Sequence, residues 1–217
     1  MKYIILLLLL LLPTTTYAKE KPANTYAPIT YEEVFDQAYN NCPYRKPDKI
    51  KTTILWQLIE VEKSFNVPVE LRGMILAAAC KESGYNPQAK GDHKFSRDKK
   101  TPMAIGILQM WKIYEKMYPG LDRTDPKAAA IGWMSHINKQ VPKVKRKCKY
   151  RRPVNIWVAA WVTGIRSKKP GGRCKERPTH LRLLKKWHRN IKRDREEQII
   201  LEEQIYEVPK IKEGDGC

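Results

Sequence analysis

The feature that most constrains the fold of this chain is an apolar run that ends abruptly at a charged pair. Residues 71–80 read LRGMILAAAC, and apolar side chains recur there at helical spacing, which predicts a buried helix. Lys81 and Glu82 follow the run, and Gly84 and Pro87, which are typical signals for the end of a helix, come soon after. The pattern therefore places Glu82 in the last turn of a buried helix.

The predicted position of Glu82 suits acid–base chemistry. The negative end of a helix dipole and apolar neighbours both disfavour the ionised form of a carboxyl group. Burial would have to supply most of the effect, because the dipole contributes only about 0.3–1 kcal/mol at an exposed site. A carboxyl group that stays protonated near neutral pH can protonate a glycosidic oxygen. The alternative, which position alone favours, is a solvated glutamate at a helix end.

Three short segments occur in an order that one known family shares. Residues 82–89 read ESGYNPQA, residues 103–109 read MAIGILQ and residues 159–164 read AAWVTG. In this order they resemble the three motifs of the lytic transglycosylase (SLT) family, which is related in fold to goose-type lysozyme. Each is weak alone, whereas the first, second and third motif together are a strong signal. The resemblance covers residues 67–165, about half of the mature chain.

The resemblance implies roles for particular side chains. In that family the Glu of the first motif protonates the leaving sugar and then acts as a base, which makes Glu82 the acid/base. Gly106 would keep the floor of the cleft low, because a residue without a side chain permits close approach. The implied substrate contacts along the glycan cleft are Ser83, Tyr85, Gly106, Gln109 and Trp161.

The third motif departs from the family at Trp161-Val162, where the family has Tyr-Asn. The family's Tyr hydroxyl supports the Glu, whereas an indole N–H can donate a hydrogen bond but cannot accept one. Trp161 could therefore hold only an ionised carboxylate or the carbonyl oxygen of a protonated carboxyl group.

A charged spacer over residues 90–103 is longer than the common family pattern. It could form a hairpin or flap over the cleft, or a solvated loop. The spacer contains Asp92 and Asp98, either of which could serve as a second carboxylate, as in an inverting lysozyme, with Asp92 the first candidate. The Lys and Arg residues around them favour the solvated loop.

The N-terminus has the pattern of a secretory signal peptide. A charged start and an apolar run over residues 3–12 precede small and polar residues, with cleavage expected after Ala18. The apolar run is about half of the roughly 20 residues that a spanning helix needs, so no transmembrane segment is expected after cleavage. The mature protein is expected in the periplasm or outside the cell.

The remaining pattern predicts an all-α protein with one lysozyme-like domain. After the signal peptide (1–18), we expect a flexible leader with a short helix (19–47), the domain itself (48–175) and a charged C-terminal helix and tail (176–217). Thr30 and Glu33 have the spacing of a capping box for the first helix. No β-rich segment is apparent. Helices are expected over residues 31–41, 48–66, 71–83, 111–117, from 126 onward, 153–165 and 177–207.

The formal net charge is +19, and the positive residues concentrate in residues 143–152 and 166–195. Nucleic acid, an anionic membrane or the acidic cell wall could suit such a surface. Export disfavours nucleic acid, whereas peptidoglycan carries carboxylates on its peptides. The basic C-terminal helix could also dock an envelope protein partner, or be merely solvated.

Five cysteines lie in the mature chain, and an exported protein can oxidise them. We expect Cys148 and Cys174 to pair, because they bracket the helix at 153–165, and closing such a loop could stabilise by about 3 kcal/mol. Cys80 is expected to be a buried structural thiol rather than a catalytic one. The four His residues lack metal-ligand spacing, and neither a phosphate-binding loop nor a dinucleotide motif is present, so no metal or cofactor is expected. Whether Cys42, Cys80 and Cys217 form disulfides stays open.

These observations predict an exported enzyme that cleaves the MurNAc–GlcNAc bond of peptidoglycan and leaves 1,6-anhydro ends. One alternative is a glycan-binding module of an envelope assembly that does not cut. Another is a lysozyme-type hydrolase that uses Asp92, and a third, weaker one is a nucleic-acid binder whose affinity would fall steeply with salt.

Overall fold

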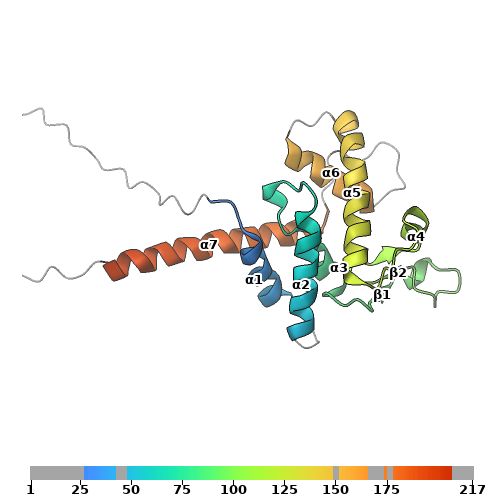
Figure 1. The fold of residues 1–217 in the computed structure, drawn as a ribbon, viewed down its shortest axis with the longest axis horizontal. Helices are drawn as coiled ribbons and strands as arrows, with labels where there is room; N and C mark the ends of the chain where they lie inside the picture. Colours follow the sequence, from blue (N-terminus) through green and yellow to red (C-terminus); the bar gives the residue numbers. More distant parts are fainter. Residues whose placement is uncertain (1–26, 43–47, 149–151, 166–173, 175–177, 207–217) are drawn as a thin grey trace, which may run out of the picture.

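The computed structural model describes residues 27–42, 48–148, 152–165, 174 and 178–206. This part of the chain is mostly helical, as expected, with seven α-helices and one small sheet (Figure 1). The helices are α1 (Tyr31–Asn41), α2 (Asp48–Lys63), α3 (Met74–Ser83), α4 (Ile113–Met117), α5 (Pro126–Cys148), α6 (Pro153–Ile165) and α7 (His180–Tyr206). The short 3-10 turns are Val69–Leu71 and His93–Phe95, and the strands are β1 (Lys90–Gly91), β2 (Ala104–Ile105) and β3 (Met110–Trp111).

Helix α3 lies in the centre of the core. Its residues 74–79 are all fully buried, so the helix is covered on every side. It begins later than expected because Gly73 has a left-handed backbone with φ 86°, and a Cβ there would lie 2.1 Å from Val34 Cγ1. It ends as predicted at Gly84, also left-handed, whose N–H donates to the carbonyl groups of Ala79 and Cys80.

Helix α1 is fixed at its start by the predicted capping box. Glu33 N donates to Thr30 Oγ1 at 3.2 Å, and Thr30 N donates to Glu33 Oε2 at 2.7 Å. The guanidinium of Arg195 on α7 binds both oxygens of Glu33, at 2.6 and 2.7 Å. The capping carboxylate thus also joins α1 to α7.

Helix α7 is half core element and half projection. Its predicted apolar stripe is buried, with Leu181, Leu184, Trp187 and Ile191 against α3 and α1. The second half runs away from the body (Figure 1), and Ile200 and Leu201 there are 54% and 58% exposed. The predicted C-terminal segment begins at residue 176. The first half of its helix therefore belongs to the core.

A small sheet accompanies the helices and is compatible with the all-α class that the sequence predicts. Strands β1, β2 and β3 pair antiparallel in sequence order, with Lys90 opposite Ile105 and Ala104 opposite Trp111. Trp111, expected at the start of a helix, forms β3 together with Met110, and the helix begins only at Ile113. The spacer over residues 90–103 forms β1 and the loop that connects β1 to β2. Strands of two residues are too short to give an alternating apolar pattern.

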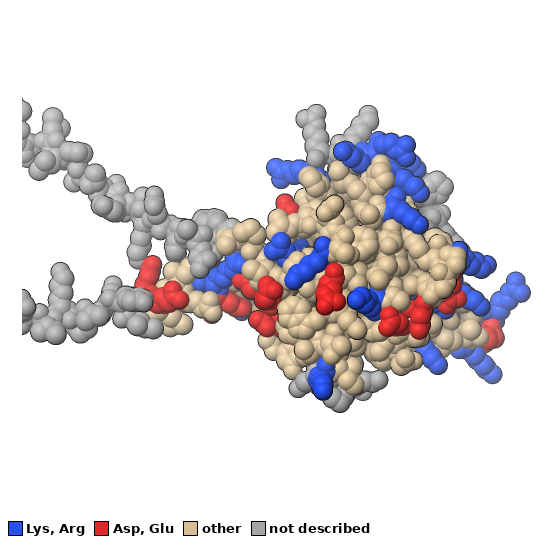
Figure 2. Space-filling view, in the orientation of Figure 1, with Lys and Arg blue, Asp and Glu red and all other residues tan. Residues whose placement is uncertain are grey.

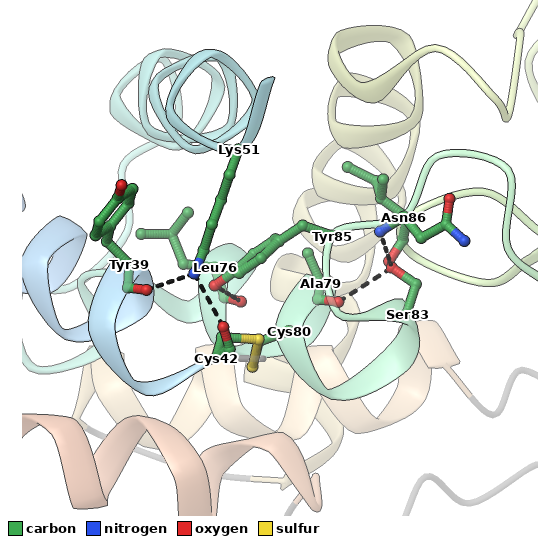
Figure 3. Close-up of a disulfide and its surroundings, with 10 residues drawn as sticks. Tyr39, Cys42, Lys51, Leu76, Ala79, Cys80, Ser83, Tyr85 and Asn86 are labelled. Carbon is green, nitrogen blue, oxygen red and sulfur yellow. Dashed lines mark hydrogen bonds between the residues drawn. A yellow bond between two sulfur atoms is a disulfide. The ribbon is translucent and has the colours of Figure 1, made fainter. Parts of the chain in front are cut away.

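Two disulfides fasten the described fold. Cys148 pairs with Cys174, as predicted. Cys80 is not a free thiol but pairs with Cys42, which joins the end of α1 to α3 (Figure 3). The buried Lys51 reaches the same corner, and its ammonium group donates to the carbonyl oxygens of Cys42, at 2.9 Å, and Tyr39. Cys217 and the predicted signal peptide lie outside the described residues.

Charge is distributed unevenly over the surface. Lys and Arg gather where α5 ends, and Asp and Glu gather toward the far end of α7 (Figure 2). The expected basic C-terminal helix is therefore basic in its first half and acidic in its second, where Glu196, Glu197, Glu202 and Glu203 lie. Of the helices in the described ranges, none has the length and apolar character needed to span a membrane.

Candidate active site

Glu82 lies in the last turn of α3, next to the helix end at Ser83 and Gly84. Its side chain is 34% exposed, so it can reach solvent while the helix that carries it is held by the core. The position agrees with the prediction from the helix-stop signals.

The environment of Glu82 differs from the apolar one that the sequence predicts. His180 Nε2 lies 2.6 Å from Glu82 Oε1, and the His180 side chain is only 6% exposed. His180 is the first residue of α7, and the packing of α7 on α3 brings together two side chains that are 98 residues apart. Sequence reasoning missed His180, because it belongs to none of the three motifs and precedes an ordinary apolar stripe.

Trp161 of the third motif stands behind this pair. Its ring stacks on the His180 imidazole, with centroids 5.8 Å apart and planes 10° apart, and Trp133 meets its edge at 5.9 Å. Trp161 is fully buried, and its Nε1 makes no hydrogen bond with any described residue. The expected glycan contact through Trp161 is therefore wrong for this structure, in which the indole forms a wall behind His180 instead.

Ser83 joins the first motif to the second. Its hydroxyl donates to the Ile107 carbonyl at 2.8 Å and accepts from Asn86 N at 3.2 Å. A further hydroxyl contact, with the carbonyl of Ala79 at 3.3 Å, points back into α3 (Figure 3). The half-buried Ser83 thus holds the end of α3 on the loop between β2 and β3.

Tyr85 is part of the core and does not line a glycan cleft. It is fully buried, and its hydroxyl donates to the Leu76 carbonyl at 3.1 Å (Figure 3). Burial raises the pKa of the Tyr85 hydroxyl well above its ordinary value. The expected substrate contact through Tyr85 is therefore corrected: its hydroxyl braces the chain that leaves α3.

Gln109 and Gly106 hold the second motif against the end of the first. The amide nitrogen of Gln109 donates to the carbonyls of Ala89, at 3.1 Å, and Gly106, at 2.9 Å. Gly106 has φ 81°, and a Cβ there would lie 1.8 Å from the carbonyl oxygen of Arg123. Gly106 is thus required by close packing on the Arg123 backbone, and its expected place in the floor of a cleft stays a prediction. Gly91 packs closely on the other end of the same amide group, because a Cβ on Gly91 would lie 2.3 Å from Gln109 Oε1.

The two spacer carboxylates are engaged within the spacer and the sheet. Asp92 accepts a hydrogen bond from the indole Nε1–H of Trp111 at 2.8 Å. Asp98 accepts three, from the hydroxyl and N–H of Thr101 and from the N–H of Lys100. These hydrogen bonds, that of the Thr101 hydroxyl first, hold the pKa of Asp98 below its ordinary range.

A second glutamate, Glu62 on α2, lies at the opposite end of α3 from Glu82. It is fully buried and accepts hydrogen bonds from Gly73 N at 2.6 Å and Ile75 N at 2.9 Å. Burial raises the pKa of Glu62 to about 7, although the two N–H groups act in the opposite direction. Being fully buried, Glu62 anchors the start of α3 and cannot meet a glycan.

The segments that carry the motifs therefore converge on one partly exposed carboxylate. Ser83 links the first motif to the second, and Trp161 of the third stacks on the imidazole that contacts Glu82. Such an arrangement can hold a carboxyl group in place and expose it for proton transfer. Comparison with protein-family models, with curated proteins and with solved structures found no match to this chain.

Proposed function

We propose that this protein is an exported lytic transglycosylase with a lysozyme-like fold, and that it acts on the glycan strands of peptidoglycan. The observation that supports this most is the convergence of three motif segments at Glu82. A partly exposed carboxylate that is held by a buried side chain from another helix is typical of a catalytic acid rather than of a solvated helix end.

Glu82 serves as acid and then as base in the proposed reaction. Its protonated carboxyl group gives a proton to the oxygen of the bond between MurNAc and GlcNAc while that oxygen separates from the anomeric carbon. The resulting carboxylate takes the proton of the 6-hydroxyl on the same MurNAc. The 6-oxygen bonds to the anomeric carbon and closes the 1,6-anhydro ring, so the proton is back on Glu82 and no water is consumed.

The engagement of the other carboxylates favours this intramolecular route over hydrolysis. A hydrolase with two catalytic carboxylates holds the second roughly 5–9.5 Å from the acid. Asp92 and Asp98 both accept hydrogen bonds within the spacer and sheet, which gives each of them a structural partner there. A hydroxyl of the substrate itself needs no such partner and gains from proximity. Hydrolysis with Asp92 as the second carboxylate is the alternative outcome.

The Glu82→Gln variant tests the proposal directly. Gln keeps the shape of the side chain but cannot give up and retrieve a proton, so wall cleavage should fall by at least about 100-fold with an unchanged circular dichroism spectrum. Glu70→Gln, at another exposed glutamate, is the matched control and should cleave like the wild type. Zymography on purified peptidoglycan measures both. Substantial lysis by a folded Glu82→Gln protein would exclude Glu82 as the acid.

Mass spectrometry of the released muropeptides separates the two reaction types. Anhydro products, lighter by one water, are expected. Predominantly reducing-end products would identify a lysozyme-type hydrolase instead, and Asp92→Asn would then be the variant to test first.

A glycan-binding module is the second candidate, and one observation favours it. Trp161 offers no hydrogen bond to Glu82, so the carboxylate lacks a direct partner from the third motif. A binding module would sediment with insoluble peptidoglycan but leave no cleared zone in a zymogram, for wild type and Glu82→Gln alike.

Export to the periplasm or the medium is part of the proposal. The two disulfides suit an oxidising compartment, and the apolar run at residues 3–12 suits a signal peptide. The projecting half of α7, with Ile200 and Leu201 exposed among glutamates, suits a contact with an envelope protein.

A further inference from the structure

We propose that His180 is a positioning residue for Glu82: its Nε2–H donates to Oε1 and leaves Oε2 to meet the glycosidic oxygen. The part of this inference that concerns catalysis rests on the proposed function. The pairing itself rests on the 2.6 Å contact between the two side chains.

The rigidity of His180 is what makes it suited to this task. The residue is only 4% exposed, its ring stacks on Trp161, and the stripe that begins with Leu181 and Leu184 anchors its helix in the core. Glu82, in contrast, is a third exposed, and an exposed glutamate on its own samples several rotamers. A fixed donor at Oε1 selects one of these rotamers before substrate arrives.

The surroundings of the imidazole favour one tautomer. Nδ1 of His180 is buried and has no hydrogen-bond partner among the described residues. A buried N–H without a partner is rarer and more costly than a lone pair without one, so the proton belongs on Nε2. His180 therefore donates from Nε2 to Glu82 Oε1.

This tautomer serves both halves of the proposed reaction. An ionised Glu82 accepts the Nε2–H bond at Oε1. When Glu82 is protonated, its carbonyl oxygen is the better acceptor and Nε2–H cannot accept the acid proton, so the same bond at Oε1 favours the proton on Oε2. His180 thereby places the transferable proton on the oxygen that no described residue holds.

Two substitutions separate the hydrogen bond from the packing of the ring. His180→Phe keeps an aromatic ring on Trp161 but removes the donor, whereas His180→Gln keeps an N–H donor but removes the ring. The Phe variant should lose about 10- to 100-fold in kcat with little change in KM, because a charge-assisted hydrogen bond is worth about that factor. The Gln variant should retain clearly more activity than the Phe variant.

The matched control is His188→Phe, on the same helix. His188 Nε2 contacts the carbonyl of Arg72 at 2.9 Å and belongs to a different part of the interface between α7 and the core, so kcat should be unchanged. A folded His180→Phe protein with wild-type kcat would overturn the proposal. So would equal losses in folded Phe and Gln variants, since these would assign the effect to the ring and not to the donor.

A spectroscopic readout tests the pairing without any activity. Nitrogen NMR of the imidazoles in the full chain should show His180 protonated at Nε2 and unprotonated at Nδ1, with assignment by His180→Gln. Glu82→Gln should shift the His180 nitrogens and leave those of His188 in place. A proton on Nδ1, or no response to Glu82→Gln, would refute the pairing. If the wild type cleaves no glycan, the proposed function fails while this readout still decides the pairing.

Discussion

Glu62 and Glu82 lie at opposite ends of α3 and do different work. Glu62 is fully buried, and its pKa of about 7 is above the ordinary value of 4.5 because burial disfavours the charged form. Between pH 4.5 and about 7, the folded state therefore binds more protons than the unfolded state. The contribution of Glu62 to stability is therefore full below about pH 4.5 and is lost as the pH rises toward 7.

The Glu62→Gln variant should remove this pH dependence. A shift from 4.5 to about 7 corresponds to a loss of about 3 kcal/mol between those pH values, which Gln cannot show because it does not titrate. Urea unfolding at several pH values measures the difference in unfolding free energy between wild type and variant. That difference should shrink as the pH rises from 4.5 to 7, and a constant difference would contradict the assignment.

Tyr85→Phe tests whether Tyr85 is structural. The variant loses the buried hydrogen bond to the Leu76 carbonyl, which should cost about 1 kcal/mol of stability. Peptidoglycan cleavage below the melting temperature should stay at the wild-type rate. Calorimetry and zymography together decide, and a large drop in cleavage with little change in melting would restore Tyr85 as a substrate contact.

The candidate site could be predicted from sequence only in part. Glu82 follows from local signals, because an apolar run, Gly84 and Pro87 are all within a few residues of it. His180 could not be found in this way, since its contact with Glu82 depends on how α7 packs on α3. The burial of Trp161 was hidden for a related reason, because α6 is apolar on most of its faces and gives no sign of which one meets a ligand.

Among the elements, helix ends were predictable and strands were not. Capping at Thr30 and at Gly84 involves residues near one another in sequence, and these ends agree with expectation. The start of α3 differs, because Gly73 is fixed by contact with Val34 and by the distant Glu62. The three strands depend on pairing across a hairpin, and two residues each leave no periodic trace.

Substitution in the first half of α7 should destabilise the protein, whereas removal of the second half should not. Trp187→Ala removes a fully buried ring between α7 and the core and should cost about 3–5 kcal/mol, with loss of cleavage because His180 sits on the same helix. A chain that ends at residue 198 removes the exposed Ile200 and Leu201 and should keep both melting temperature and cleavage. If the shortened chain melts far lower, the projecting half contributes to the fold after all.

At the scale of the whole molecule, Glu82 and His180 each come a few residues after a cysteine that forms a disulfide. Cys80 is two residues before Glu82 within α3, and Cys174 is six residues before His180. The core surrounds α3 on every side, so Glu82 has support besides its bridge. His180 begins its helix, and Cys174 ties the chain ahead of it to the end of α5.

Removing each disulfide by a pair of Cys→Ala substitutions should show that Glu82 depends less on its disulfide than His180 does. Loop separations of 38 and 26 residues correspond to about 4 and about 3.5 kcal/mol of lost stability. Loss of the Cys148–Cys174 bridge should also lower kcat in the folded protein, whereas loss of the Cys42–Cys80 bridge should not. Equal kcat values for the two folded variants would show that Cys174 has no influence on His180.

The disulfides also bear on the safety of the cell that makes the protein. An enzyme that cuts peptidoglycan is a hazard to its own producer, and the cytoplasm keeps thiols reduced. A newly made chain there would lack both covalent ties, so α1 would not be linked to α3, nor α5 to the chain ahead of His180. Under the proposed function, the site at Glu82 and His180 would therefore gain both covalent ties only in an oxidising compartment outside the cytoplasm.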